Sequence, residues 1–346
     1  MENKAIFMHG TNEMIWKDVP MPTAKEKEVL IKVEYVGICG SDVHYFQHGR
    51  IGDFIVEGDF ILGHEVAGTI VEIGSEVKNL KVGDRVALEP GKTCGKCEFC
   101  KTGRYNLCPD VEFFATPPYH GVFTNYVTHP EDMCFKLPEN VSTMEGALVE
   151  PLAVGLHATS VGDVKLGDTV VIYGSGCIGL VTLLSAKARG ASKIIVVDVL
   201  ENRLKTALKL GATHVVNPMQ VEDAVKTILE LTEGKGAQVV IETAGAVATV
   251  KQTVHVLKTG GTIVMVGMAP KDEIDFNFAK LMGKEGVVKT IFRYRNLYPV
   301  AINAISSGAI NVKDIVSHEF DFQDTKKAFD FVVSNAKDVV KAVIKI

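Results

Sequence analysis

The second half of the chain repeats one pattern, in which a short apolar run is followed by a segment with the apolar spacing of a helix. The apolar runs predict strands at Thr169–Tyr173, Lys193–Asp198, His214–Asn217, Gln238–Glu242 and Thr262–Gly267. The intervening segments predict helices near Ile178–Arg189, Asn202–Leu210, Val221–Leu231 and Ala246–Leu257. Strands that alternate with helices are joined by right-handed crossovers and form a parallel sheet covered on both faces. We therefore expect a doubly wound, Rossmann-type α/β domain over residues 155–289.

The first part of the chain, residues 1–154, has a different pattern. Short β-rich runs are separated by Gly and Pro turns, and they predict strands at Val29–Val36, Val66–Ile73 and Arg85–Leu88. After about Lys289 the alternation stops, and a helix and a final strand at Val339–Ile344 follow. A tail of this length has too few residues for a core of its own. We expect residues 290–346 to return and complete the β-rich first domain.

The composition is that of a globular protein with about two domains. The chain has 346 residues, 37 basic and 42 acidic side chains, and a formal net charge of −5. Because Lys and Arg form no dense run, it lacks the charge pattern of a protein that binds nucleic acid or an anionic membrane. Its apolar stretches are far shorter than the ~20 residues of a membrane span, and its N-terminus lacks a secretory signal. The expected partner is a small molecule, and the expected location is the cytoplasm.

A glycine-rich turn follows the predicted strand at Thr169–Tyr173 and opens the predicted helix after it. Its residues run Gly174-Ser175-Gly176-Cys177-Ile178-Gly179. The first Gly permits the tight turn, the second lets the backbone approach a pyrophosphate, and the third lets helix and strand pack closely. The helix N-terminus then favours the negative charge of the phosphates. The position of this motif between strand and helix predicts a dinucleotide site.

Asp198 ends the next predicted strand, 19 residues after Gly179. An acid at this place accepts hydrogen bonds from the adenosine ribose and repels a 2′-phosphate, which favours NAD over NADP. The alternative is a solvated residue at a strand end. Arg203 has two interpretations as well, since it could stack on the adenine or be an exposed helix charge.

Four of the seven cysteines lie close together, as Cys94, Cys97, Cys100 and Cys108. In a reducing cytoplasm this spacing favours metal ligation over disulfides. Four thiolates close a tetrahedron around zinc and leave no open position, which predicts a structural zinc site. Pro109 after the last cysteine suggests an iron–sulfur loop, but the ferredoxin pattern separates its last two cysteines by three residues, whereas seven separate them here.

A second candidate metal centre is dispersed along the chain as Cys39, His64, Glu65 and Glu150. One thiolate, one imidazole and one or two carboxylates leave room for a water or a substrate oxygen, which suits a catalytic zinc. A lone Cys is more often a small buried apolar residue, and a lone His is more often a satisfied polar group. The residues alone leave both interpretations open.

The motifs around these residues resemble those of the zinc-dependent medium-chain alcohol dehydrogenase family. Gly63-His64-Glu65, followed by Gly68, Gly74 and Val77, matches its zinc signature, and Cys39-Gly40-Ser41-Asp42-x-His44 matches its first-ligand loop. Within the family the chain is most similar to the sorbitol (polyol) dehydrogenases. That likeness is carried by Ser41–Tyr45, Phe114–Pro118, Glu150–Gly155 and Phe292-Arg293-Tyr294-x-Asn296. The resemblance covers essentially the whole chain and implies a GroES-like catalytic domain beside the Rossmann domain.

The resemblance also implies roles for individual residues. Cys39, His64 and Glu65 would hold the catalytic zinc, with Glu150 bound directly or through the water on the metal. The residues facing the polyol would be Tyr45, Glu150, Arg293 and Tyr294. Beyond Gly174, Gly176 and Gly179, the NAD site would be lined by Ile178, Asp198, Arg203, Val266, Gly267, Met268, Ile291, Phe292 and Arg293.

The implied reaction is the reversible oxidation of a secondary alcohol with hydride transfer to the nicotinamide. Zinc would lower the pKa of the bound alcohol, so that the alkoxide exists near neutral pH. By the same resemblance, Ser41 and His44 would relay the proton, with Glu150 as a second route. Asp42 is either a carboxylate that orients His64 or a cap of the following turn.

The substrate class depends on Arg293 and Tyr294, since a guanidinium and a phenol supply several hydrogen-bond donors for vicinal hydroxyls. Arg293 could instead pair with an acid or with the cofactor. The expected activity is of the L-iditol 2-dehydrogenase type, and the alternatives are an L-threonine or 2,3-butanediol dehydrogenase and a non-catalytic NAD-binding protein. Mammalian polyol dehydrogenases lack the four-cysteine loop that this chain keeps, and the family implies a homotetramer.

Overall fold

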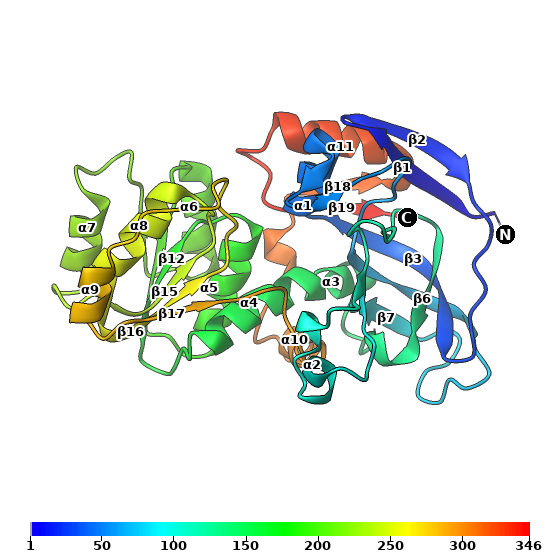
Figure 1. Cartoon of the computed structure of the whole chain (residues 1–346), viewed down its shortest axis with the longest axis horizontal. Coiled ribbons are helices and arrows are strands. Elements are labelled where there is room, and N and C mark those ends of the chain that lie inside the picture. The colour runs from blue at the N-terminus through cyan, green and yellow to red at the C-terminus, as the bar shows by residue number, and fades with distance from the viewer. Residues whose placement is uncertain (1) are drawn as a thin grey trace. The chain divides into compact units, whose positions relative to one another are not determined.

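The computed structural model describes residues 2–346, which divide into two compact units. The first unit contains the residues up to Glu150 together with Tyr298–Gly308 and Val316–Ile346. The second unit contains Pro151–Leu297 and Ala309–Ile315. In Figure 1 the blue N-terminal and red C-terminal segments of the first unit lie side by side, because strands from both ends of the chain pair in one sheet. The domain boundaries expected at 154/155 and 289/290 stay predictions.

The first unit is built on a seven-stranded sheet with the order β11-β7-β6-β3-β19-β18, in which β10 also pairs with β3. The strands are β3 (Glu28–Ile38), β6 (Glu65–Ile73), β7 (Arg85–Leu88), β10 (Tyr126–Pro130), β11 (Cys134–Lys136), β18 (His318–Asp321) and β19 (Ala342–Lys345). Two-stranded pairs are formed by β1 (Lys4–Gly10) with β2 (Glu13–Asp18), β4 (Arg50–Ile51) with β5 (Phe54–Ile55), and β8 (Gly91–Lys92) with β9 (Glu112–Phe113). The long strand β3 therefore joins segments that are far apart in the sequence.

The helices of the first unit are short, and several of them pack on this sheet. They are α1 (Gly40–His48), α2 (Glu98–Lys101), α3 (Thr143–Ala147), α10 (Tyr298–Ser306) and α11 (Thr325–Ser334). Phe46 of α1 and Phe123 both contact Phe329 of α11, with ring centroids 5.2 and 5.7 Å apart. Because these rings are buried in one core, α1 is fixed close to the end of β3.

The second unit contains a six-stranded parallel sheet with the order β14-β13-β12-β15-β16-β17. Its strands are β12 (Thr169–Tyr173), β13 (Lys193–Val197), β14 (His214–Val216), β15 (Ala237–Glu242), β16 (Leu257–Met265) and β17 (Val287–Thr290). Its helices are α5 (Cys177–Ala188), α6 (Glu201–Leu210), α7 (Ala224–Leu231), α8 (Val247–Val256) and α9 (Phe278–Gly283). The unit boundary at Pro151 falls in the first turn of α4 (Val149–Val161).

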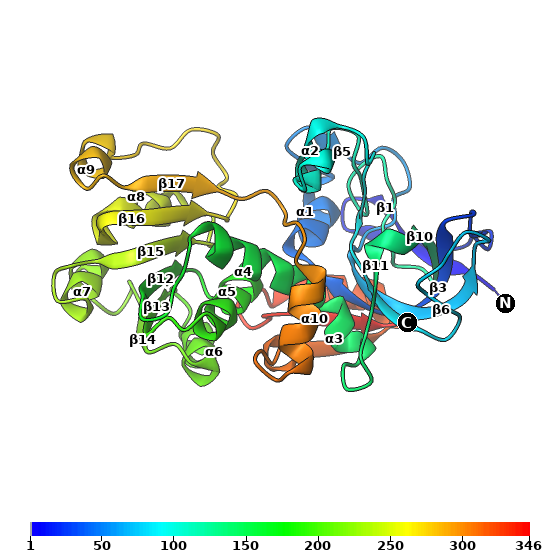
Figure 2. The same ribbon diagram turned by 90° about the horizontal axis from the view of Figure 1, so that it is seen from below.

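Helices cover both faces of this sheet, as Figure 2 shows. Val171 and Tyr173 of β12 pack in one core with Ile228 of α7 and Val254 of α8. Side chains alternate along a strand, so Val170 and Ile172 point to the opposite face. Burial on both faces explains why β12 is an uninterrupted apolar run in the sequence.

The predicted α/β class, with a doubly wound sheet beside a β-rich unit, is confirmed. Every strand predicted in the second unit is present, and the ends differ by a few residues because turns extend or shorten the ladders. The strand β17 was not predicted, since its four residues are all exposed at a sheet edge. The last strand begins at Ala342, three residues later than expected from the apolar run at Val339. None of the helices between residues 2 and 346 is long and apolar enough to cross a lipid bilayer.

Candidate functional site

The first candidate centre lies where β3 ends and β6 begins. The two strands are antiparallel, and Gly37 of β3 pairs with Glu65, the first residue of β6. Cys39 follows β3 directly and caps α1, so the strand pairing brings it close to His64 and Glu65. The ligand atoms of Cys39, His64 and Glu65 all lie within 4.8 Å of one another. His64 and Glu65 are buried.

This donor set fits zinc. The group offers one sulfur, one imidazole nitrogen and one carboxylate oxygen, which are the donors found in zinc sites. Bonds of about 2.0 to 2.3 Å in a tetrahedron place ligand atoms roughly 3.5 Å apart, so side-chain rotations would be enough to close this group around an ion. Glu150 is not a member of this group among the residues that the structure describes.

Asp42 ties the main chain of two ligand segments together. Its buried carboxylate accepts hydrogen bonds from the backbone N–H of Cys39 at 3.0 Å and of Gly63 at 2.9 Å. One of its oxygens lies 3.6 Å from Nδ1 of His64. Asp42 thus caps the turn and also faces the imidazole of His64. These are the two positions that the sequence offered as alternatives for this residue. Burial opposes protonation of His64, but the charges of Asp42 and Cys39 raise its pKa well above the usual value.

Lys341 is a buried partner of this group that the sequence did not suggest. Its Nζ lies 2.7 and 2.8 Å from the two oxygens of Glu65 and donates to the carbonyl of Ile38 at 3.1 Å. A Cβ on Gly37 would lie 2.0 Å from Oε2 of Glu65, so only glycine leaves space for this carboxylate. Each carboxylate oxygen has two lone pairs, and Glu65 can therefore serve Lys341 and a metal together. The signal in the sequence was a lone charge inside the apolar run 339–344.

Glu150 belongs to a second buried acidic region of the first unit. Glu150 is 7% exposed. Burial of Glu89 and the negative charge of Glu150 together raise the pKa of Glu89 to about 7. Oε1 of Glu89 accepts a hydrogen bond from the hydroxyl of Tyr105 at 2.7 Å. Tyr105 comes from the loop of the four cysteines, so this contact links that loop to the acidic region. Glu89 was not predicted as a site residue, because one acid after a strand gives no distinctive pattern.

The remaining predicted residues of the first unit lie on α1. Ser41 is partly buried and His44 is exposed, with its ring 4.6 Å from that of His48. Burial and the charge of His48 lower the pKa of His44. Tyr45 is buried, with its ring 6.4 Å from that of Phe60.

The four predicted structural-zinc ligands gather in one place. The sulfur atoms of Cys94, Cys97, Cys100 and Cys108 lie within 4.8 Å of one another. Cys94 accepts from the backbone N–H of Cys97, and Cys97 accepts from that of Cys100, both at 3.4 Å. Backbone donors of this kind lower the pKa of Cys94 to about 7. No disulfide joins any of these thiols in residues 2–346, and the arrangement fits a closed zinc site.

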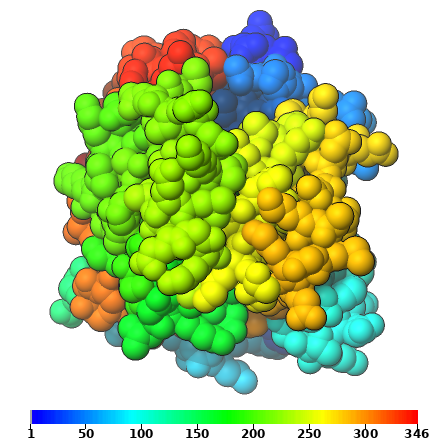
Figure 3. All heavy atoms as spheres, turned by 90° about the vertical axis from the view of Figure 1, so that its left-hand side faces the viewer, coloured from blue at the N-terminus to red at the C-terminus, as the bar shows by residue number. Residues whose placement is uncertain are grey.

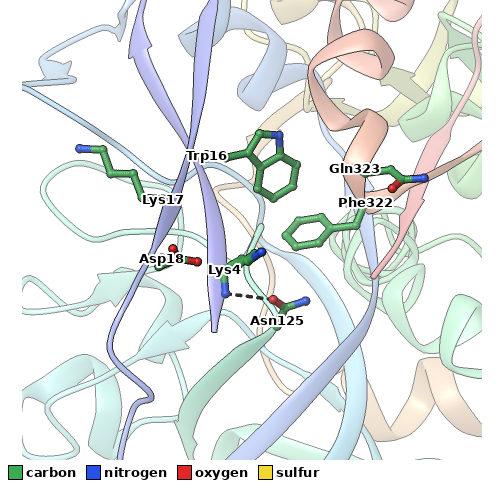
Figure 4. Close-up of a pocket in the computed structure, with 7 residues that line it drawn as sticks. All are labelled: Lys4, Trp16, Lys17, Asp18, Asn125, Phe322 and Gln323. Carbon is green, nitrogen blue, oxygen red and sulfur yellow. Dashed lines mark hydrogen bonds between the residues drawn. The ribbon is translucent and has the colours of Figure 1, made fainter. Parts of the chain in front are cut away.

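An open groove of about 450 Å³ lies elsewhere on the first unit (Figure 4). Its wall includes Trp16, whose ring meets that of Phe322 edge-on at 4.8 Å, and Asn125, which accepts from the backbone N–H of Lys4 at 2.9 Å. None of the predicted site residues lines it.

The glycine-rich turn of the second unit has the close contacts that its pattern predicts. Gly174 has a φ of +94°, and a Cβ on it would lie 2.9 Å from Oγ1 of Thr243. A Cβ on Gly179 would lie 2.0 Å from the carbonyl oxygen of Gly174. Gly176 caps α5, and a Cβ there would meet only a guanidinium nitrogen of Arg203, at 3.7 Å. The turn is therefore closely packed at Gly174 and Gly179 and open at Gly176. A phosphate site needs such an open position, where a ligand can approach the backbone.

Asp198 is already engaged with this turn. One oxygen accepts from the backbone N–H of Ser175 at 2.7 Å and from its hydroxyl at 2.9 Å. The other oxygen accepts from the backbone N–H of Leu200 at 2.9 Å. The second oxygen keeps a lone pair for a ribose hydroxyl.

The other predicted cofactor residues follow neighbouring strands at the carboxyl edge of the same sheet. Residues 266–268 follow β16 and residues 291–293 follow β17. Met268 is exposed, and Arg293 has a φ of +54° with its guanidinium 4.8 Å from the centre of the Phe292 ring. Tyr294 is 2% exposed. Ligands of open α/β sheets bind at this edge.

Comparisons with known proteins bear on the family. Residues 25–139 match the alcohol dehydrogenase GroES-like domain, and residues 177–307 match the zinc-binding dehydrogenase domain. The chain is 51% identical over 350 residues to an uncharacterized zinc-type alcohol dehydrogenase-like protein of Escherichia coli (strain K12), YdjJ, with 99% of both chains covered. It is 43% identical over 341 residues to sorbitol dehydrogenase of Bacillus subtilis (strain 168), covering 99% of this chain and 96% of that one. The structure of 2R,3R-butanediol dehydrogenase from Bacillus subtilis matches with a TM-score of 0.92 and 31% identity over 99% of each chain.

A GroES-like domain of the alcohol dehydrogenases followed by a zinc-binding dehydrogenase domain defines the class of zinc-dependent dehydrogenases. The chain belongs to the zinc-dependent medium-chain alcohol dehydrogenase family, and within it the chain resembles the sorbitol dehydrogenases. The resemblance read from the motifs and the GroES-like assignment are both confirmed.

The ion pair at Glu65 yields a stability prediction. Lys341→Met keeps an unbranched side chain that is one heavy atom shorter, but it leaves a buried carboxylate without its cation. Removing one partner of such a pair costs about 3 to 5 kcal/mol. We expect urea unfolding to show a loss of this size. The matched control is Lys345→Met, at an exposed position of β19, the strand that follows Lys341, which should change stability by less than about 0.5 kcal/mol. An equally small change in both variants would contradict the importance of the pair.

Proposed function

We propose that this protein is an NAD-dependent polyol dehydrogenase, which reversibly oxidises a secondary hydroxyl of a sorbitol- or xylitol-type polyol to the ketose. The observation that carries the proposal is the group formed by Cys39, His64 and Glu65, whose donor atoms suit a catalytic zinc. The glycine-rich turn with Asp198 supplies the matching cofactor site in the second unit. The relative named sorbitol dehydrogenase supports the substrate class.

Different residues of the chain have different proposed roles in the reaction. When bound, zinc would supply a Lewis acid for the alcohol oxygen, and NAD would supply the acceptor of the hydride. Cys39, His64 and Glu65 are proposed to hold the metal, and Asp42 keeps two of these segments in register. The reaction releases one proton, which we assign to Ser41 and His44, with the buried Glu150 as a second acceptor.

We propose hydroxyl recognition for Tyr45, Glu150, Arg293 and Tyr294. Phenol and guanidinium groups donate to hydroxyls, and the carboxylate accepts from them. A site with these groups discriminates against alcohols that lack the additional hydroxyls. The second candidate is a 2,3-butanediol dehydrogenase, which the fold of the butanediol enzyme favours. An L-threonine dehydrogenase is the remaining alternative on this scaffold.

We further propose that the protein assembles as a homotetramer in the cytoplasm, where the four-thiolate loop stays reduced. The support for assembly is β17, an edge strand with Val287 and Val288 exposed. Phe278 and Met282 of α9 are exposed as well. The orange segment that contains α9 and β17 lies at the surface in Figure 3. Open apolar edges of this kind pair with another chain.

The metal proposal predicts two zinc ions per chain with separable roles. Cys39→Ser should abolish activity while the melting temperature stays near that of the parent. Cys97→Ser should loosen the loop 91–109 and lower the melting temperature, because a structural zinc holds its loop together. Metal analysis checks the stoichiometry, with one zinc expected in each variant. A parent protein with a single zinc would refute the assignment.

The cofactor proposal predicts that Asp198→Ala weakens NAD binding and moves the preference toward NADP, because the repulsion of a 2′-phosphate is removed. The measurement is the ratio of the two dissociation constants. Glu201→Ala is the control, since this nearby acid pairs with Asn217 and Gln220 and should leave the ratio unchanged. Equal use of both cofactors by the parent would show that Asp198 has another role.

The substrate proposal predicts a selective loss in Arg293→Ala. Losing one or two charge-assisted hydrogen bonds in a desolvated pocket costs on the order of 2–4 kcal/mol, or roughly 30- to 1000-fold in kcat/KM for a polyol. A simple secondary alcohol such as 2-butanol does not use the contact and should be affected much less. Arg295→Ala, two residues away, should affect both substrates alike. A general loss in Arg293→Ala would indicate a cofactor or folding role, and no loss would favour the butanediol or threonine alternative.

A further inference from the structure

Glu242 is a buried acid that none of the predicted roles uses. It is the last residue of β15 and is 0% exposed. A carboxylate this deeply buried is costly unless its oxygens are satisfied by hydrogen bonds. The groups that satisfy it therefore show what its place in the fold requires.

The side chain of Glu242 organises the turn that follows it. Oε1 accepts from the backbone N–H groups of Ala244 at 3.1 Å and Gly245 at 3.0 Å, and Oε2 accepts from Gly245 at 3.1 Å. The hydroxyl of Thr249, in α8, donates to Oε1 at 2.7 Å. One carboxylate thus holds both residues 243–246, here called the first loop, and the start of α8.

The main chain of Glu242 holds a second segment. Its carbonyl oxygen accepts from the backbone N–H groups of Val266 at 2.9 Å and Gly267 at 3.0 Å. Residues 266–268, here called the second loop, follow β16, the neighbour of β15 in the sheet (Figure 2). The two loops are thereby anchored on one residue, one through its side chain and the other through its backbone.

The two loops also touch each other without side chains between them. A Cβ on Gly267 would lie 2.2 Å from the backbone nitrogen of Gly245 and 2.8 Å from Oε2 of Glu242. A Cβ on Gly245, where φ is +62°, would lie 2.4 Å from the carbonyl oxygen of Met268. Because the two backbones lie this close together, a shift of the Glu242 carboxylate would disturb both loops.

The first loop also contacts the glycine-rich turn. The hydroxyl of Thr243 donates to the carbonyl of Tyr173 at 2.7 Å and lies against Gly174. Tyr173 pairs with Glu242 in the ladder of β12 and β15. Three segments at the carboxyl edge of the sheet therefore share one framework, with Glu242 at its centre.

We infer that Glu242 is a positioning residue for dinucleotide binding, which holds the first and second loops in the arrangement that the cofactor requires. The inference rests on the proposed function, since it assumes that a dinucleotide binds at this edge. Glu242 itself is fully buried and acts through the backbone of its neighbours. Because these loops are ordered before binding, less conformational entropy is lost when the ligand binds.

The test compares three variants by NADH titration, melting temperature and kinetics. Glu242→Gln keeps the shape but turns an amide N–H₂ toward backbone donors, and we expect the NADH dissociation constant to rise roughly 10- to 100-fold. Thr249→Val removes one donor and should raise it about threefold. Asp168→Asn is the control, because this acid accepts the N–H of Lys165 before β12, at the opposite edge, and should leave NADH affinity unchanged. KM for NAD should rise more than kcat falls, with the zinc content preserved.

The outcomes distinguish a role of Glu242 in positioning the two loops from a role in stabilising the fold alone. Glu242→Gln with a lower melting temperature but an NADH affinity within twofold of the parent would overturn the inference. If Glu242→Gln does not fold, Thr249→Val decides, and an unchanged affinity there would overturn it too. A parent that binds neither NADH nor NADPH would refute the proposed function together with the inference. A parent that binds NADH while Glu242→Gln binds it equally well would refute the inference alone.

Discussion

The contact between Glu65 and Lys341 is the interaction on which the candidate metal centre depends. It joins the start of β6 to the residue before β19, next to a glycine of β3 that leaves room for the carboxylate. Replacing a buried ion pair with apolar residues is often neutral or stabilising, so general stability does not explain why this pair is present. Its consequence is local, because it fixes one carboxylate beside the sulfur of Cys39 and the imidazole of His64. It also ties the C-terminal segment, which re-enters the first unit as β18 and β19, to the candidate centre.

Both units combine a glycine with a buried carboxylate to hold charged groups close to the backbone. Where a carboxylate must lie close to the backbone, glycine supplies the space, as at Gly37 in the first unit and at Gly267 in the second. A buried carboxylate then collects the backbone N–H groups of the surrounding turns, as Asp42 and Glu242 do. The cost of burying each acid is offset by several charge-assisted hydrogen bonds. Each acid in return fixes the turn from which the functional groups project.

The sequence predicted those features that depend on local periodicity or on short spacing. β12 was predicted residue for residue, because it is buried on both faces, and the four cysteines lie within one loop. The group of Cys39 and His64 could not be derived from spacing, since it arises from the long-range pairing of β3 and β6 and was expected only from the family resemblance. Lys341, Glu89 and Glu242 were missed for the same reason. A single charged residue gains its meaning from partners that are distant in the sequence or from the backbone around it.

We propose that this chain transfers a hydride from a secondary carbinol carbon of a polyol to NAD. The most direct measurement is a turnover with sorbitol that carries deuterium at the reacting carbon, followed by mass spectrometry of both products. We expect one deuterium in the reduced nicotinamide and none at the new carbonyl carbon of the ketose. Reduced cofactor without deuterium, or no turnover of any polyol by zinc-loaded protein, would contradict it.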